Sequence, residues 1–199
     1  ELMKMKELPA SCTVGDWLRR MSQDGRGLLG LGKVNQHVVV KVLNGDPRPE
    51  YTLDVDATII ETEKEGAQWT YKKEKGYQPL LGLLFELGLV LGDEFRDGNI
   101  PAGAGAVEFL ELCQRMMPKG KRIAYYRADS ASYQARVINF CFDQGMLFTI
   151  TADQDRAVKE AIKNIGKEEW APHERDREIA ETVHSMNGTR EAFRLIVQR

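Results

Sequence analysis

The sequence predicts an α/β fold built on a mixed sheet flanked by helices, and three observations support this. Three stretches with strand character, 51–60, 80–86 and 89–95, follow one another with no helix between them. Two more strand-like stretches, 122–127 and 146–151, alternate with segments whose apolar residues have helical spacing. Strands joined directly pair antiparallel and strands joined through helices pair parallel, so this order predicts a sheet of both kinds.

The composition is that of a soluble globular domain. The chain has 199 residues, 42% of them hydrophobic and 29% charged, which excludes a disordered chain and suits one domain with an appendage. Its formal net charge is −2, so any contact with nucleic acid must come from local basic patches. No apolar run approaches the ~18 residues of a membrane span, and we expect no membrane partner.

The cysteines and histidines are scattered, and they argue against a disulfide framework or a structural zinc site. Their spacing favours a protein of a reducing cytoplasm. Because the first residue is Glu1, we expect the chain to begin inside a longer protein. The residues concerned are Cys12, Cys113, Cys141, His37, His173 and His184.

The N-terminal part, residues 1–45, is predicted to be a helical lead-in. Residues 16–21 indicate a short helix, and Asp24–Gly27 breaks it. Residues 28–43 contain valines that favour a strand, but their apolar positions also fit a buried helix, which is our interpretation. Gly27–Lys33 matches G-x-x-x-x-G-K, yet Val34 stands where a phosphate-binding loop needs Ser or Thr, so we interpret it as a glycine-rich link.

The remaining elements follow from local signals. The 80–86 and 89–95 strands turn at Leu87–Gly88, and Gly92 indicates a bulge. A helix after the 122–127 strand is expected to be capped by Ser130 or Ser132 and to run to about Gln144. The other predicted elements are helices at 106–117 and 153–165 and C-terminal strands at 178–183 and 193–198, which turn at Asn187–Gly188.

This order is that of a ribonuclease H-like sheet, in which the first and fourth strands are neighbours. Asp54 and Asp56 lie two apart on the first strand and share one face, while Asp129 follows the fourth strand. Asp56 and Asp129 would then approach each other, and two close carboxylates repel unless a cation lies between them. Mg²⁺ is the natural cation, because it takes hard oxygen ligands.

Four motifs in this order and spacing carry a family resemblance: Leu53–Thr58, Gly76–Leu81, Arg96–Asn99 and Arg127–Ser130. Together they resemble the catalytic domain of DDE transposases from bacterial insertion sequences, over about residues 30–199. The resemblance implies a ribonuclease H-like catalytic core at 46–166 and the start of a β-rich insertion at 167–199. It also implies Mg²⁺, with Mn²⁺ as a substitute, as the cofactor.

The resemblance assigns roles to single residues. Asp56-Ala57-Thr58 matches the family's first acid in Asp-x-Thr, and Asp129 matches the second, so both are predicted to be catalytic and to bind the metal. Asp54, Thr58 and Arg127 are predicted to support them. The family's third acid is a Glu on a later helix; no such Glu is found up to Arg199, so we expect this fragment alone to be inactive.

The implied activity of the parent protein is DNA strand cleavage and transfer during transposition. Its partners would be transposon ends and target DNA, with a homodimer as one assembly that the family allows, in a bacterial cytoplasm at the nucleoid. Lys72, Lys73, Lys75 and Arg122 are predicted to contact DNA, the lysines lying beside Trp69 and Tyr71. Trp170 is interpreted first as the anchor of a small core and second as a base-stacking residue. The alternative function is that of an inactive, DNA-binding remnant of a transposase.

Overall fold

The computed structural model describes residues 9–22 and 25–199, and the chain divides into two compact units, Glu1–Asp46 and Pro47–Arg199. The first unit contains α1 (Ser11–Ser22) and α2 (Arg26–Gly45), which confirms the helical interpretation of residues 28–43. Gly27–Lys33 lies within α2 and forms no loop. Residues 1–8 of the predicted lead-in and Asp24 of the predicted break lie outside the described residues.

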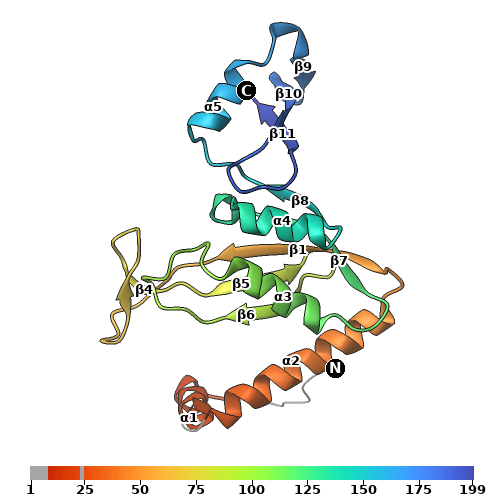
Figure 1. The fold of residues 1–199 in the computed structure, drawn as a ribbon. Helices are drawn as coiled ribbons and strands as arrows, with labels where there is room; N and C mark the ends of the chain where they lie inside the picture. The colour runs from red at the N-terminus through yellow and green to blue at the C-terminus, as the bar shows by residue number, and fades with distance from the viewer. Residues whose placement is uncertain (1–8, 23–24) are drawn as a thin grey trace. The chain divides into compact units, whose positions relative to one another are not determined.

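The second unit is organised around one five-stranded sheet (Figure 1). Its strands stand in the order β6-β5-β1-β7-β8, with β6, β5 and β1 antiparallel and β1, β7 and β8 parallel. This is the strand order of a ribonuclease H-like fold, and it confirms the predicted fold class. The strands are β1 (Glu50–Ala57), β5 (Leu80–Leu84), β6 (Leu89–Glu94), β7 (Arg122–Ala128) and β8 (Leu147–Ile150).

The alternation of apolar and polar residues along β1 fixes which face enters the core. Leu53 is fully buried and Val55 is 6% exposed, while Asp54 and Asp56 point to the other face. Helix α3 (Ala106–Met116) packs on the sheet through its buried apolar stripe (Figure 1). The bulge expected near Gly92 is present, because the β5–β6 register shifts between Gly82 and Leu83.

The segment after β7 differs from the prediction. Neither serine caps a long helix there; Asp129 caps a short 3₁₀ turn at Ser130–Ser132, and α4 (Ala135–Asp143) begins only after it. The Ser132 hydroxyl lies 2.8 Å from the Tyr126 hydroxyl inside the core, so its hydrogen bond goes to a side chain. The carboxylate of Asp129 therefore satisfies the first free backbone N–H group.

A small second sheet occupies the segment that the sequence showed only as polar. Its strands are β2 (Ile60–Glu61), β3 (Gln68–Trp69) and β4 (Lys75–Tyr77), in the order β2-β4-β3. Strands of two and three residues are too short for a period of two to be recognised. Ile60, predicted to end the first long strand, belongs to this sheet instead.

The C-terminal part adds α5 (Arg156–Lys163) and a three-stranded antiparallel sheet. Strands β10 (Arg177–His184) and β11 (Phe193–Gln198) confirm the two predicted strands, whereas β9 (Ala171–His173) was not predicted. Val158 of α5 and Leu195 of β11 are buried with Tyr133 and Ile138 in one apolar cluster. The division at 166/167 stays a prediction. No helix in the described residues is long and apolar enough to cross a membrane.

The core predicts a pattern of thiol reactivity. Burial raises the pKa of the Cys113 thiol to about 12, and that of Cys141 likewise to about 12, so both stay protonated at pH 8. The thiolate is the reactive form. A disulfide reagent at pH 8 should therefore modify exposed Cys12 quickly and the two buried thiols only after unfolding in urea. Rapid modification of all three thiols in the native protein would contradict this packing.

Candidate functional site

Two predicted acids meet at one edge of the main sheet. Strands β1 and β7 pair in parallel, with Asp54 opposite Arg127 and Val55 opposite Ala128. One residue further along both strands stand Asp56 and Asp129, at the carboxyl ends of neighbouring strands. Strands in a sheet are ~4.8 Å apart, and both acids are exposed, so both carboxylates are accessible from solvent at this edge.

The backbone around Asp129 holds this acid in an extended conformation. Asp129 has φ −77° and ψ −172°, and its Oδ1 accepts a hydrogen bond from the Ala131 backbone N–H at 3.0 Å. The chain then turns away from the sheet into the 3₁₀ turn. One carboxylate oxygen thus fixes the turn, while the residue remains exposed at the sheet edge.

Asp54, which lies two residues before Asp56 on β1, is bound to Arg127. The Arg127 guanidinium donates to Asp54 Oδ2, and its Cζ lies 4.3 Å from the centre of the Phe85 ring. The hydrogen bond to Asp54 is the main cause that raises the pKa of Arg127. Asp54 Oδ1 is buried without a hydrogen-bond partner. Asp54 is therefore neutralised by its neighbour, which suits a supporting role.

Thr58 continues the same strand face just beyond Asp56. Its backbone N–H donates to the Pro79 carbonyl at 3.1 Å, so the end of β1 stays attached to the chain that enters β5. The residue itself is exposed. The structure thus brings Asp54, Asp56, Thr58, Arg127 and Asp129 to one edge of the sheet.

A buried arginine, Arg96, supports the chain next to this edge, and the sequence analysis did not predict it as a site residue. Arg96 is 5% exposed, and it donates to the carbonyls of Gln78 at 3.1 Å, Ala104 at 2.9 Å and Ala102 at 3.3 Å. Burial lowers its pKa, and the charge of Glu94 opposes that shift. One side chain thereby joins the segment before β5 to the 101–105 loop.

That loop in turn contacts the Asp129 turn. Gln134 Nε2 donates to the carbonyls of Gly103 at 2.9 Å and Ala131 at 2.8 Å. A Cβ atom at Gly103 would lie 2.2 Å from the Ala131 carbonyl oxygen, so only glycine permits this approach. The Arg96–Asn99 motif signalled this support in the sequence, but its partners are distant in the chain and could not be identified from spacing.

The predicted DNA-binding residues fall into two groups. Lys72 and Lys73 are exposed in the turn between β3 and β4, while Lys75 is half-buried on β4 with its Nζ 3.4 Å from the Glu65 carbonyl. The small sheet follows β1 in the chain, and Figure 1 shows its strand β4 beyond the end of the main sheet where β1 finishes. Arg122 begins β7, seven residues and ~23 Å from Asp129, and its Nε lies 3.0 Å from Glu50 Oε1.

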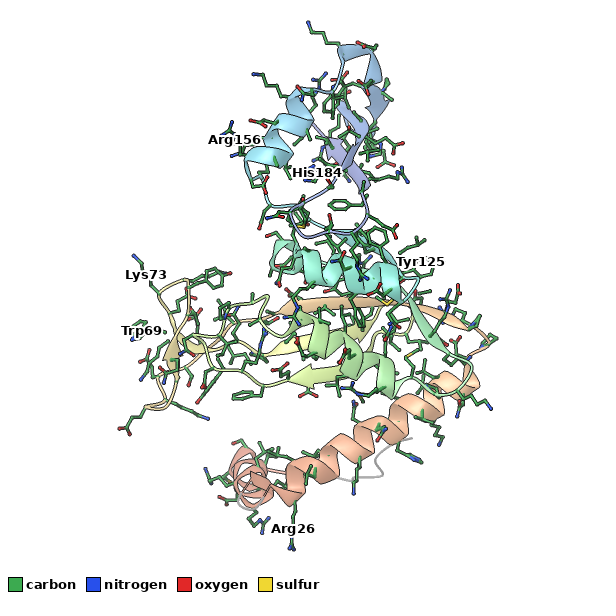
Figure 2. All side chains as sticks on the ribbon, viewed as in Figure 1. Arg26, Trp69, Lys73, Tyr125, Arg156 and His184 are labelled. Atoms are coloured by element: carbon green, nitrogen blue, oxygen red, sulfur yellow. The ribbon has the colours of Figure 1, made fainter. Side chains whose placement is uncertain are left out.

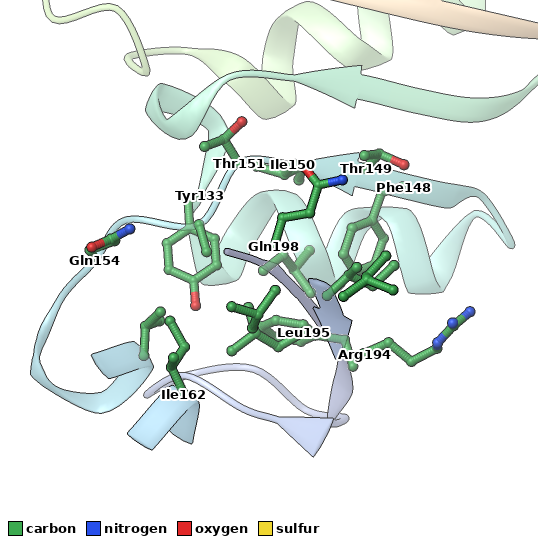
Figure 3. Close-up of a pocket in the computed structure, with 17 residues that line it drawn as sticks. Tyr133, Phe148, Thr149, Ile150, Thr151, Gln154, Ile162, Arg194, Leu195 and Gln198 are labelled. Atoms are coloured by element: carbon green, nitrogen blue, oxygen red, sulfur yellow. The ribbon is translucent and has the colours of Figure 1, made fainter. Parts of the chain in front are cut away.

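A pocket of about 600 Å³ lies elsewhere, between β8, α5 and β11 (Figure 3). Its lining is mostly apolar and includes Tyr133, Phe148 and Leu195, which belong to or pack against the buried cluster described above. None of the five residues brought together at the sheet edge lines it. The pocket is therefore separate from the acidic edge.

The donors at the acidic edge fit a hard divalent cation. Within residues 9–22 and 25–199, no group of three or more His, Cys, Asp or Glu side chains is placed to hold a metal ion. Mg²⁺, however, is commonly bound through only one or two carboxylates, with water and substrate phosphate as its other ligands. Two adjacent, exposed carboxylates match that requirement.

The comparison with protein families decides the family. The sequence profile described as "Transposase DDE domain group 1" matches residues 4–198, nearly the whole chain. The chain belongs to this family. The fold and the family together identify a transposase DDE domain. A search of curated proteins found no match.

Solved structures with partial likeness to this transposase domain are distant in sequence. A chain of the simian T-cell lymphotropic virus intasome in complex with PP2A regulatory subunit B56 gamma is 12% identical, with TM-score 0.40 over 59% of this chain and 40% of that one. The catalytic core domain of BIV integrase is 14% identical, with TM-score 0.34 over 57% and 62%. The piggyBac transposase synaptic complex with hairpin DNA is 10% identical, with TM-score 0.44 over 76% and 33%. The chain thus spans less than two thirds of each of these proteins.

Replacing the buried arginine should destabilise the domain. Arg96→Ala leaves three carbonyl acceptors without their donor, and we expect the free energy of unfolding to fall by about 2–4 kcal/mol. Arg136→Ala, which removes an exposed ion pair with Glu108, should cost less than about 1 kcal/mol and serves as the control. Urea denaturation measures both changes. Equal losses for the two variants would show that Arg96 does not hold the loop.

Proposed function

We propose that this domain carries out metal-dependent cleavage and transfer of DNA strands, with Asp56 and Asp129 as its two metal-binding catalytic acids. The observation that carries the proposal is the parallel register of β1 and β7, which brings both acids to one sheet edge. Two exposed carboxylates at the ends of neighbouring strands repel each other, and a divalent cation relieves the repulsion. Mg²⁺ is the proposed cation and Mn²⁺ its substitute.

The chemistry divides between the cation and the protein. When bound, a divalent cation neutralises charge on the phosphodiester and on the attacking and leaving oxygens. Asp56 and Asp129 hold it, and the hydrogen bond from the Ala131 N–H keeps one oxygen of Asp129 in place. Arg127 neutralises Asp54, so that a third negative charge does not add to the repulsion at the edge. Thr58 ties the strand end that carries Asp56 to β5.

We further propose that catalysis by the parent protein needs a third acid, a Glu on a helix, as the family resemblance implies. Support comes from the family resemblance, and from the finding that no group of three or more His, Cys, Asp or Glu side chains in the described residues is placed to hold a metal ion. On this proposal the 199-residue chain binds the metal and DNA but cleaves little. The alternative, a DNA-binding remnant without chemistry, predicts DNA binding without a metal site.

DNA is the proposed macromolecular partner, both as transposon ends and as target. The piggyBac transposase structure is that of a synaptic complex with hairpin DNA. In this chain Lys72 and Lys73 are exposed in the turn between β3 and β4, where they would contact phosphates, and Lys75 lies next to them. Arg122 would reach DNA only if its pair with Glu50 opened. A homodimeric parent in the bacterial nucleoid completes the proposal.

Mn²⁺ binding tests the two acids. Asp56→Asn and Asp129→Asn should each weaken Mn²⁺ binding at least ~10-fold. Changing a residue that only hydrogen-bonds to a metal ligand already has an effect of about this size, and loss of a ligand should have no smaller one. Asp93→Asn, which removes an exposed carboxylate from β6 of the same sheet, should leave binding unchanged. Electron paramagnetic resonance of free Mn²⁺ measures the affinity. If both site variants bind like the native chain, the acids hold no metal; DNA binding without Mn²⁺ binding would favour the remnant.

The salt dependence of DNA binding tests the lysines. Each phosphate contact contributes about 0.9 to the slope of log K against log salt for duplex DNA. Lys72→Ala with Lys73→Ala should therefore reduce the slope by about 1.8, and Arg122→Ala by a further 0.9 or so if Arg122 also contacts DNA. Fluorescence anisotropy with a labelled duplex measures the slope. An unchanged slope in the double variant would exclude these lysines from the interface.

A further inference from the structure

The small sheet extends the chain beyond the acidic edge, and we call it the finger, residues 60–77. It continues the β1–β5 ladder: after the Thr58–Pro79 bond, Ile60 pairs with Tyr77, and the Thr62 N–H donates to the Lys75 carbonyl at 3.0 Å. Its base is locked by Gly98, whose N–H donates to the Gly76 carbonyl at 3.1 Å. A Cβ atom at Gly98 would lie 2.5 Å from that oxygen, so the finger and the 97–100 turn are in direct contact.

The finger presents two aromatic rings to solvent. Trp69 is 65% exposed and Tyr71 is 71% exposed. They are two residues apart in the chain, and Thr70 between them is buried. The ring of Trp170, in contrast, is covered by the guanidinium of Arg199, whose Cζ lies 3.9 Å from the ring centre. Of the two tryptophans in the second unit, Trp69 is thus the exposed one.

Two lysines stand next to these rings at the tip of the finger, and Figure 2 shows Lys73 there, with Trp69 projecting outward below it. The turn is closed by bonds from Lys73 N–H to the Thr70 carbonyl at 3.0 Å and from Thr70 N–H to the Glu74 carbonyl at 2.8 Å. Lys72 Nζ lies 5.9 Å from the centre of the Tyr71 ring. Three of the finger's four glutamates, Glu61, Glu63 and Glu65, precede β3 and lie outside this turn.

The backbone of Lys73 has a left-handed conformation within the turn. Lys73 has φ 65°, a left-handed conformation that glycine or asparagine adopts with less strain. A lysine held there retains a strained backbone together with an exposed positive charge. Strained residues cluster at ligand-binding sites, and an observed outlier supports a functional hypothesis.

We propose that the finger binds unpaired nucleotides of DNA next to the cleavage site, with Trp69 and Tyr71 stacking on bases and Lys72 and Lys73 contacting phosphates. Exposed aromatic rings beside cations are the usual means of holding single-stranded nucleic acid. Trp69 pairs with Lys75, and Lys75 in turn pairs with Thr62. Thr62 is six residues from Asp56 along the chain, which is ~20 Å for an extended strand. At ~3.4 Å per nucleotide, the contacted bases lie up to about six nucleotides from the reacting phosphate. This inference rests on the proposed function.

The test compares two DNA probes with the full 199-residue chain. One probe is a blunt-ended duplex of two separate strands, and the other is the same duplex with an unpaired 3′ tail of about six nucleotides, the reach estimated above. Trp69→Ala with Tyr71→Ala should weaken binding of the tailed probe about 5- to 100-fold, the effect of losing a stacked base. Binding of the paired probe should change less than about twofold, since the rings meet no paired base.

The matched control keeps the rings. Trp69→Phe with Tyr71→Phe should bind the tailed probe within about threefold of the native chain, because stacking needs an aromatic face and no particular polar group. Thermal melting of both double variants should match the native chain, since the replaced side chains are exposed. An equal loss for both probes, or no loss in the alanine variant, would overturn the proposal.

The outcomes separate this inference from the function on which it rests. A chain that binds Mn²⁺ through Asp56 and Asp129 and binds the tailed probe independently of the two rings refutes the finger alone. A ring-dependent preference for the tailed probe without Mn²⁺ binding supports the finger and refutes the metal site. A native chain that binds neither DNA probe refutes both.

Discussion

The parallel pairing of β1 with β7 is the constraint on which the proposed chemistry depends. It places Asp56 and Asp129 at the same sheet edge although the two acids are far apart in the sequence. The register is held by the core, because Leu53 and Val55 must enter it from the opposite face of β1. A slip by one residue would exchange the two faces, burying the carboxylates and exposing the apolar side chains. Hydrophobic packing on one face thus determines the position of charge on the other.

The acidic edge is also held from outside the sheet. Arg127 balances the charge of Asp54, and the Phe85 ring packs against the guanidinium. On the other side, Arg96 fixes the 101–105 loop, and Gln134 connects that loop to the turn capped by Asp129. These contacts involve the residues around the edge, while Asp56 and Asp129 themselves stay exposed. Such an arrangement keeps two like charges available for a cation and a phosphate.

The finger extends the same framework beyond the sheet. Its strands continue the β1–β5 ladder, and Gly98 fixes its base, so its tip has a defined position relative to the end of β1. A nucleic acid held at Trp69 and the neighbouring lysines would therefore meet Asp56 at a set distance. The same segment of chain would then connect the DNA-binding residues to Asp56. Positioning the substrate in this way lowers the free energy needed to reach a reactive geometry.

The order of the main strands, the faces of β1 and the two candidate acids were predictable from the sequence, because alternation along a strand and short motifs are local signals. The metal-binding roles of Asp56 and Asp129 remain predictions. Only the tertiary structure decided the capping role of Asp129, the three carbonyl partners of Arg96, the small sheet and the cover over Trp170. These features depend on contacts between residues distant in the chain, and no local period encodes such contacts.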